Sequence, residues 1–157
     1  MRFSFAIVAT LLGLTNANFD LYAGTEQSLG GFFMVWTIHQ TPPDCKRVNQ
    51  AETYLQLDDV SGNKVGVRCE GSGCSTYQPS NVNVVEMHFS NNPLFHFTIY
   101  KDRGHPYKMY GRDGKTYGEC IVFTGDTFDC ISTGLLGGVR MYRCLTQFNV
   151  AQIESAR

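Results

Sequence analysis

Charge is scarce in this sequence, and neither sign dominates. Only 17 % of the 157 residues are charged, and 13 Lys and Arg stand against 14 Asp and Glu, which gives a formal net charge of −1. Proteins that hold nucleic acid through their overall field carry a marked basic excess, so we do not expect a nucleic-acid partner. Disordered chains combine high net charge with low hydrophobicity, whereas 43 % of these residues are hydrophobic, and we expect a folded domain.

The motifs of several common catalytic and metal sites are also missing. The sequence has no C-x-x-C pair, and its four histidines do not have the spacing of a zinc finger. It contains no G-x-S-x-G, no P-loop and no G-x-G-x-x-G between a strand and a helix. These absences disfavour a thiol redox centre, a serine hydrolase and the common nucleotide-binding folds, and we expect no metal and no cofactor.

Long apolar runs are absent except at the very start. Residues 3–14 are apolar, Arg2 precedes them, and the small residues Thr15 and Ala17 follow at the spacing that signal peptidase accepts. Twelve residues of helix span about 18 Å, too little for a hydrocarbon core of about 30 Å. The sequence therefore predicts a signal peptide over residues 1–17, a secreted, extracellular domain over 18–157, and no membrane span.

Six cysteines lie in the predicted mature chain. An even number in an exported chain predicts three disulfides, and six cysteines allow 15 pairings, among which the sequence does not choose. A domain of this size also buries a substantial core, so the disulfides add to the core rather than replace it. The cysteines are Cys45, Cys69, Cys74, Cys120, Cys130 and Cys144.

Short apolar runs separated by Gly, Asn, Asp and Pro predict an all-β fold. Many short strands with regular turns favour a single, monomeric antiparallel sandwich or barrel, with one short helix near residues 146–155. The predicted strands cover 32–39, 53–57, 64–69, 82–89, 94–101, 107–110, 116–123 and 139–144.

Two hairpins can be predicted in register. Pairing Met87 with Phe97 places the large apolar side chains of 82–89 and 94–101 on one face, and a slip by one residue would divide them between the faces. The second hairpin turns at Asp113-Gly114, a dipeptide that favours a two-residue turn. That turn pairs Tyr110 with Tyr117 and Lys108 with Glu119.

The first hairpin gathers the strongest candidate for chemistry. Its polar face carries Glu86, His88 and His96, two imidazoles and a carboxylate that could act as acid and base in a small secreted ribonuclease. Three such side chains could also hold a metal ion. The favoured interpretation is the simplest one, the polar outer face of a half-buried hairpin.

A second candidate is the basic and aromatic stretch from 100 to 117. Aromatic rings stack on sugars or bases, and cations hold uronate or phosphate, so the stretch could bind a cell-wall polysaccharide. The alternative is an ordinary exposed hairpin. The candidate binding residues are Tyr100, Lys101, Arg103, His105, Tyr107, Lys108, Tyr110, Arg112, Lys115 and Tyr117.

In layout the chain resembles the small secreted cysteine-rich proteins of filamentous fungi, many of which are effectors that act on a host. The resemblance rests on the signal MRFSFAIVATLLGLTNA, the six cysteines, RCEGSGC at 68–74, and HFTIYKDRGHPYKMYGRDGKTYGEC at 96–120. It implies secretion, a disulfide-stabilised β fold and binding to a host protein or a cell-wall polysaccharide. It assigns no site residues, and we expect a binding protein rather than an enzyme.

Overall fold

Strands dominate the computed structural model, which describes residues 17–131 and 134–156. The predicted signal peptide, except for Ala17, lies outside the described residues. The strands are β1 (Asn18–Ser28), β2 (Gly31–His39), β3 (Thr53–Leu55), β4 (Gly66–Glu70), β5 (Val84–His88), β6 (His96–Tyr100), β7 (Tyr107–Gly111), β8 (Thr116–Val122), β9 (Thr127–Ile131) and β10 (Leu135–Thr146). The helices are α1 (Cys45–Val48), α2 (Gly73–Thr76) and α3 (Val150–Glu154), with 3₁₀ turns η1 (Pro79–Asn81), η2 (Pro93–Phe95) and η3 (Lys101–Arg103).

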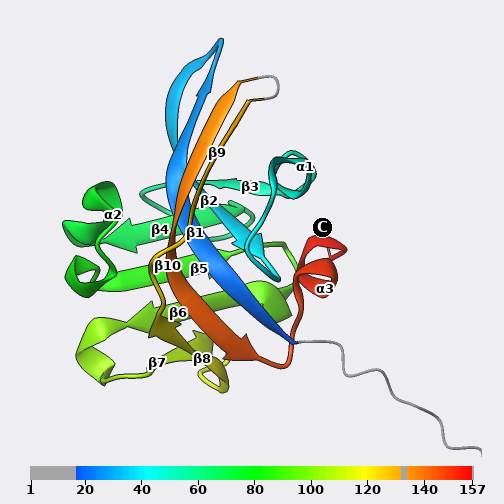
Figure 1. The fold of residues 1–157 in the computed structure, drawn as a ribbon. Coiled ribbons are helices and arrows are strands. Elements are labelled where there is room, and N and C mark those ends of the chain that lie inside the picture. The colour runs from blue at the N-terminus through cyan, green and yellow to red at the C-terminus, as the bar shows by residue number, and fades with distance from the viewer. Residues whose placement is uncertain (1–16, 132–133, 157) are drawn as a thin grey trace, which may run out of the picture.

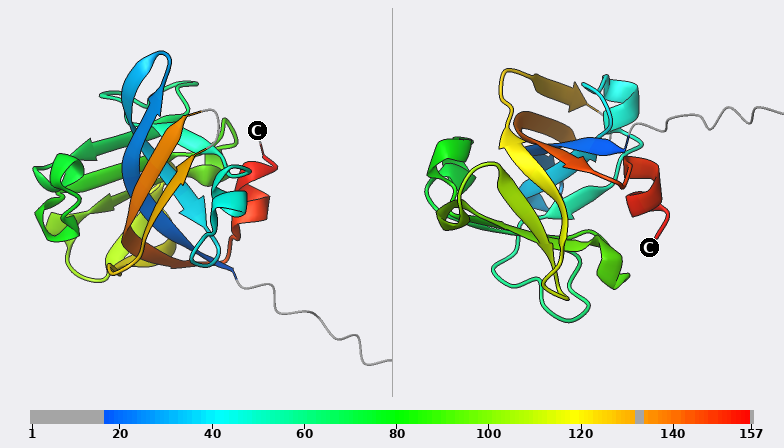
Figure 2. Two further views of the ribbon diagram at one scale, coloured as in Figure 1. Left: turned by 45° about the horizontal axis from the view of Figure 1, so that its top comes forward. Right: turned by 90° about the horizontal axis from the view of Figure 1, so that it is seen from below.

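The described strands form one antiparallel sheet that curls into a nearly closed barrel (Figures 1 and 2). Their order is β3-β2-β1-β10-β8-β7-β6-β5-β4, and β9 pairs with β10 beside this path. The two ends of the order meet where Gln56 bridges to Val67 and where the Leu57 amide donates to the Val67 carbonyl at 2.9 Å. Of the two architectures expected from the sequence, the barrel is the one that forms.

Successive side chains along each strand point alternately into and out of the barrel, and those that point inward are large and apolar. Trp36, Leu21, Met87, Phe97 and Met141 have no exposed surface. They come from five different strands and belong to one continuous cluster. Side chains of this size are excluded from water only when the sheet surrounds them on opposite sides, so burial of this cluster stabilises the curled form of the sheet.

A smaller apolar cluster lies outside the barrel, under α1. It joins Tyr22, Val48, Phe128 and Cys130. Asp44 begins α1 by accepting the Arg47 amide on its side chain, at 2.9 Å, which fixes the start of this one-turn helix. The short helix thus covers apolar side chains that would otherwise face water.

Three disulfides pair all six cysteines, as the sequence predicts. They join Cys45 to Cys130, Cys69 to Cys74, and Cys120 to Cys144. The first ties α1 to β9, the second closes a short loop between β4 and α2, and the third links the paired strands β8 and β10. Three disulfides with no free thiol indicate an oxidising compartment, such as the extracellular space.

Helices are short throughout the part of the chain that the structure describes. The longest, α3, has five residues, and none of the described helices could cross a membrane. Asn149 caps α3 by accepting the Gln152 amide, while the Gln152 side chain accepts the Asn149 amide. The short C-terminal helix expected from the sequence is confirmed.

A buried acidic side chain links β1 to β10. Asp20 is 1 % exposed, and its carboxylate accepts from Arg140 at 3.2 Å and from Arg143 at 2.6 and 2.8 Å. Both arginines also lie over the Phe123 ring, at 4.0 and 4.1 Å from its centre. A buried carboxylate is tolerated because its charge is fully paired.

The predictions at strand level are partly confirmed. The pairing of β5 with β6 has the predicted register, Val85 opposite Ile99 and Met87 opposite Phe97. Strands β1 and β9 were not predicted. In β1 a register shift between Leu21 and Tyr22 breaks the alternation by which a strand is recognised in sequence.

The predicted register of the second hairpin is half right. Lys108 lies opposite Glu119, and the two side chains form an ion pair at 2.8 Å. Tyr110, however, lies opposite Thr116 rather than Tyr117. The turn is one residue longer than predicted, since Gly111 donates its amide to the Lys115 carbonyl, and an extra residue in β8 absorbs the difference as a bulge.

Candidate functional site

An open groove on the outer face of the sheet brings the two predicted sites together. Its volume is about 550 Å³, and the strands β5, β6 and β7 supply much of its lining, together with η3 and the turns on either side. The residues that line it are Ser61, Gly62, Glu86, His96, Thr98, Tyr100, Arg103, Tyr110, Gly111, Arg112 and Gly114. The two candidates meet because Tyr100 follows His96 and Thr98 on the same face of β6, and because the pairing of β6 with β7 brings Tyr110 beside them.

Glu86 and His96 meet at one part of this groove. The Nε2–H of His96 donates to Oε1 of Glu86 at 2.8 Å, and Arg68 on β4 donates from Nε to Oε2 at 2.8 Å. Both oxygens of the carboxylate are therefore occupied. Arg68 lies directly opposite Glu86 in the pairing of β4 with β5, so the sheet register places this cation.

His88 stands behind this pair rather than in the groove. Its ring stacks on the ring of His96, with centres 4.4 Å apart, and it is only 2 % exposed. Its Nδ1 lies 2.8 Å from the carbonyl oxygen of Val60, and because a carbonyl only accepts, this nitrogen carries the proton. The contact fixes the segment before β4, and Ser61 and Gly62 of that segment line the groove.

Burial and pairing set the charges of the two side chains in the groove. Burial lowers the pKa of His96, against the opposing effect of its hydrogen bond to Glu86, while the neighbouring His88 and Arg112 lower it further. Burial acts to raise the pKa of Glu86, but its bonds to His96 and Arg68 outweigh burial and hold that pKa below its usual value. Near neutral pH the groove therefore presents an ionised carboxylate and a neutral imidazole.

This protonation state limits the catalytic use of His96. Since Nε2 carries the proton given to Glu86, Nδ1 is the basic nitrogen, and it is buried without a hydrogen-bond partner. The carboxylate of Glu86 is a weak base because both of its oxygens accept from donors. Glu86 and His96 are therefore better placed to form a rigid polar surface in the groove than to transfer protons to a substrate.

Two arginines supply the positive charge of the groove. The guanidinium of Arg103 lies over the ring of Tyr100, at 3.9 Å from its centre, and at 4.9 Å from the centre of the Tyr110 ring. Among the described residues, no carboxylate pairs with Arg103 or with Arg112. The rings hold the plane of Arg103 and leave the N–H edge of its guanidinium available for an acceptor.

The rest of the predicted basic and aromatic stretch does not reach the groove. Tyr107 is buried against Tyr142, because it alternates with Lys108 and faces the core. Tyr117 packs against Phe97 and Phe148. Three further members have partners outside the groove: Lys101 donates to the Ser80 carbonyl, Lys108 pairs with Glu119 and Lys115 with Asp113, while His105 packs against Tyr107.

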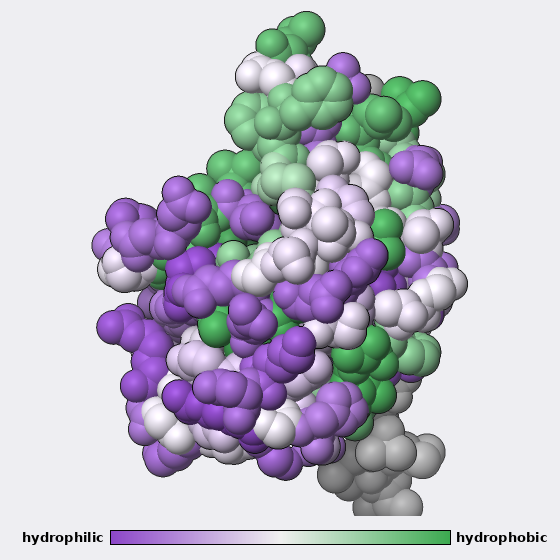
Figure 3. All heavy atoms as spheres, turned by 90° about the vertical axis from the view of Figure 1, so that its left-hand side faces the viewer, coloured by the Kyte–Doolittle hydropathy of each residue, from purple (hydrophilic) through white to green (hydrophobic). Residues whose placement is uncertain are grey.

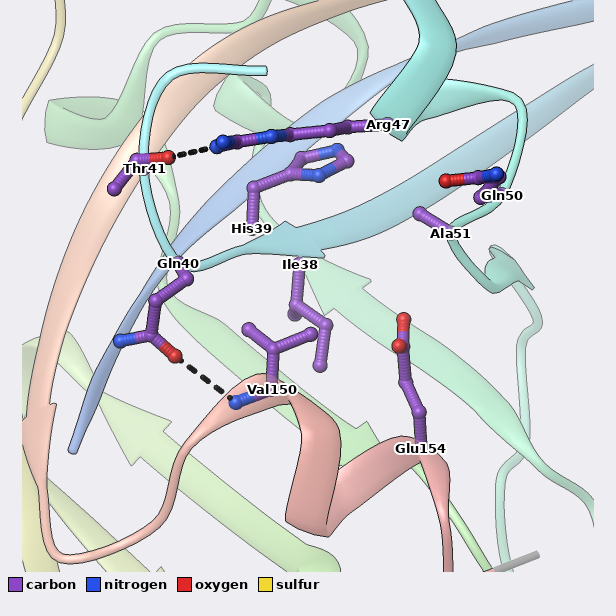
Figure 4. Close-up of a pocket in the computed structure, with 9 residues that line it drawn as sticks. All are labelled: Ile38, His39, Gln40, Thr41, Arg47, Gln50, Ala51, Val150 and Glu154. Atoms are coloured by element: carbon purple, nitrogen blue, oxygen red, sulfur yellow. Dashed lines mark hydrogen bonds between the residues drawn. The ribbon is translucent and has the colours of Figure 1, made fainter. Parts of the chain in front are cut away.

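A second cleft lies between the end of β2, α1 and α3, with a volume of about 450 Å³. In Figure 4 the Arg47 side chain extends over the ring of His39 toward Thr41, whose hydroxyl accepts from it. Ile38 and Val150 give this cleft an apolar floor. The sequence did not predict it, because α1 and α3 are far apart in the chain.

Metal ligands do not converge in the part of the chain that the structure describes: no group of three or more His, Cys, Asp or Glu side chains is placed to hold an ion. Glu86, His88 and His96 do lie together, but each is engaged as described above.

Comparison with known proteins returns no relative. No protein-family model, no curated protein and no solved structure matches the chain.

Proposed function

We propose that this protein is secreted and acts by binding an acidic polysaccharide, such as a uronate chain, at a host or microbial surface, as an effector-like protein of a filamentous fungus. One observation carries the proposal: Arg103 and Arg112, which lack a carboxylate partner among the described residues, line the same groove. Unpaired guanidinium groups in a cleft are suited to carboxylates, which they bind through two parallel N–H bonds.

The surroundings of the two arginines favour an acidic sugar chain over nucleic acid. Arg103 covers one face of the Tyr100 ring, which leaves less aromatic surface on which a base could stack. Thr98 and Ser61 add hydroxyl groups that can bond to sugar hydroxyls along the groove.

Calorimetric titration with an oligogalacturonate tests this proposal. The variants Arg103→Gln and Arg112→Gln each remove one guanidinium, and Arg47→Gln, in the second cleft, is the matched control. A charge-assisted hydrogen bond contributes about 1.5–3 kcal/mol, so each groove variant should weaken binding by about 10- to 100-fold while the control does not change it. Binding should also fall as salt is raised.

Equal affinity for an uncharged oligosaccharide, or an equal loss in the Arg47→Gln control, would contradict the proposal. A single-stranded RNA oligonucleotide is the comparison ligand. If it binds more tightly than the uronate chain, through the same two arginines, the ligand class proposed here is wrong.

A hydrolase that cleaves RNA is the second candidate function. The observation in its favour is the contact of His96 with Glu86 at 2.8 Å in the groove that also holds Arg112. Such an enzyme needs a base and an acid beside a cation that holds the phosphate. Incubation of the purified protein with RNA tests it, with Glu86→Gln as the inactive control, and cleavage that persists in this variant would eliminate it.

A further inference from the structure

Two hairpins extend beyond the barrel and carry an apolar tip. Hairpin β1–β2 and hairpin β9–β10 lie side by side through the pairing of β1 with β10, and together they project from the barrel in Figure 1. Figure 3 shows hydrophobic side chains gathered at this projecting end. We define the apolar tip by its exposed members, which are Leu29, Phe32, Phe33, Ile131 and Leu135.

The degree of exposure of these side chains is unusual. Leu29 is fully exposed, Ile131 is 81 % exposed and Phe32 is 74 % exposed. Phe32 and Ile131 lie in one row across the sheet, since Phe32 pairs with Gln27, Gln27 with Leu135, and Leu135 with Ile131. Contiguous exposed apolar side chains of this kind mark an interaction surface.

Charged side chains are excluded from the same region. Residues 27–38, and the described residues among 130–139, include no Asp, Glu, Lys or Arg. The charges nearest to the members of the tip in sequence are Glu26 and Asp129, both acidic, while Arg140 follows Leu135 by five residues. Glu26 and Asp129 lie at similar distances from the end of the tip, since Glu26 pairs with Leu136 and Asp129 with the adjacent Gly137.

The distance from the tip to these charges matches a shallow insertion into lipid. Leu29, at the turn, lies three residues beyond Glu26, which at the strand rise of about 3.3 Å per residue is about 10 Å, whereas Phe32 and Ile131 lie in the row of Gln27, one residue or about 3 Å beyond Glu26. Side chains that dock at the surface of a bilayer enter it by about 5–10 Å. Leu29 could therefore enter the acyl boundary, with Phe32 and Ile131 reaching its outer edge through their side chains, while Glu26 and Asp129 remain in water.

We propose that the apolar tip docks on the surface of a zwitterionic lipid bilayer. A projecting tip offers no hollow for a small ligand but enters a soft apolar phase readily, and the acidic residues behind it disfavour anionic lipid. The outer backbone edge of β9 has no strand partner among the described residues, and unpaired backbone groups do not enter hydrocarbon. Docking is therefore restricted to the interface and does not extend to a span.

Co-sedimentation with vesicles tests this inference. The full mature chain is mixed with phosphatidylcholine vesicles and, in a second arm, with vesicles that contain added phosphatidylserine. The tip variant Phe32→Ser/Ile131→Ser removes two exposed side chains, and Leu94→Ser, at 45 % exposure on η2, is the control. Near-ultraviolet circular dichroism checks that all variants keep the fold.

The expected result is that the unmodified chain and Leu94→Ser sediment with phosphatidylcholine and bind less to the anionic vesicles. The tip variant should partition more weakly by on the order of tenfold for each side chain that was inserted. Failure of the unmodified chain to sediment, or equal sedimentation of the tip variant, would overturn the inference. So would a vesicle-independent dimer, seen by sedimentation velocity, that the tip variant abolishes, since the tip would then bind a second copy. The polysaccharide titration concerns the groove, so the two proposals fail separately.

Discussion

His39 should make the fold sensitive to acid between pH 7 and pH 5. Its ring is 5 % exposed and lies edge-on to the rings of Tyr22 and Phe128, at 5.3 and 5.8 Å between centres. Burial lowers its pKa from 6.5 to about 4, with Arg47 acting in the same direction and the nearby carboxylate of Asp20 opposing. The folded protein therefore holds this imidazole neutral.

The sign and size of the effect follow from this difference. Below pH 6.5 the unfolded chain takes up a proton on His39 that the folded chain does not, so the unfolded state gains stability as the pH falls. With values of 6.5 and about 4, the loss between pH 7 and pH 5 is about 2 kcal/mol of unfolding free energy. His96 titrates in the same direction, so the contribution of His39 must be isolated by a variant.

Urea unfolding at pH 7 and at pH 5, with intact disulfides, measures the effect. The variant His39→Gln keeps a polar side chain that does not titrate. Both proteins lose stability on acidification, but the unmodified chain should lose about 2 kcal/mol more than the variant. If the two proteins lose the same amount, His39 is not the buried neutral group described above.

Three further predictions concern stability. Asp20→Asn leaves Arg140 and Arg143 without their counter-charge and should lower the unfolding free energy by about 3 kcal/mol. This loss corresponds to a drop of roughly 10 °C in Tm, and an unchanged Tm would contradict the pairing described. Replacing the Cys45–Cys130 pair by serines opens a loop of 85 residues and should lower the unfolding free energy by about 4–5 kcal/mol. The same change at the Cys69–Cys74 pair, with a separation of 5, should lower it by about 2 kcal/mol. Chemical denaturation should therefore find the first variant less stable than the second. Gly24→Ala would place a Cβ 1.8 Å from the Gly137 carbonyl oxygen and should destabilise the β1–β10 pairing by about 3 kcal/mol or more, which amide exchange in β1 would report as lost protection.

Local pattern was sufficient to predict much of the sheet. The β5–β6 register follows from one row of large apolar side chains, and the structure has the same pairs. The turn of the next hairpin was mistaken because Asp113 accepts the Lys115 amide and lengthens the loop to three residues. Turn length depends on such side-chain bonds, which a dipeptide preference does not include.

The groove could be predicted only in pieces. The contact of His96 with Glu86 is local to one hairpin, but Arg68 reaches Glu86 through the pairing of β4 with β5, which no local pattern determines. Alternation in β7 is the sequence signal that separates the inward Tyr107 from the outward Lys108. Closure of the barrel depends on Gln56 and Val67, whose meeting requires the whole sheet.

Amide chemical shifts of the isotope-labelled chain, recorded during titration with an oligogalacturonate, test the central claim most directly. We expect the shifts to concentrate at Thr98, Gly111 and Arg112, which line the groove, and the amide signals of Ala51 and Val150 in the second cleft to stay unchanged. Shifts confined to the second cleft, or no shifts at all at a concentration of ligand that saturates known uronate binders, would contradict it.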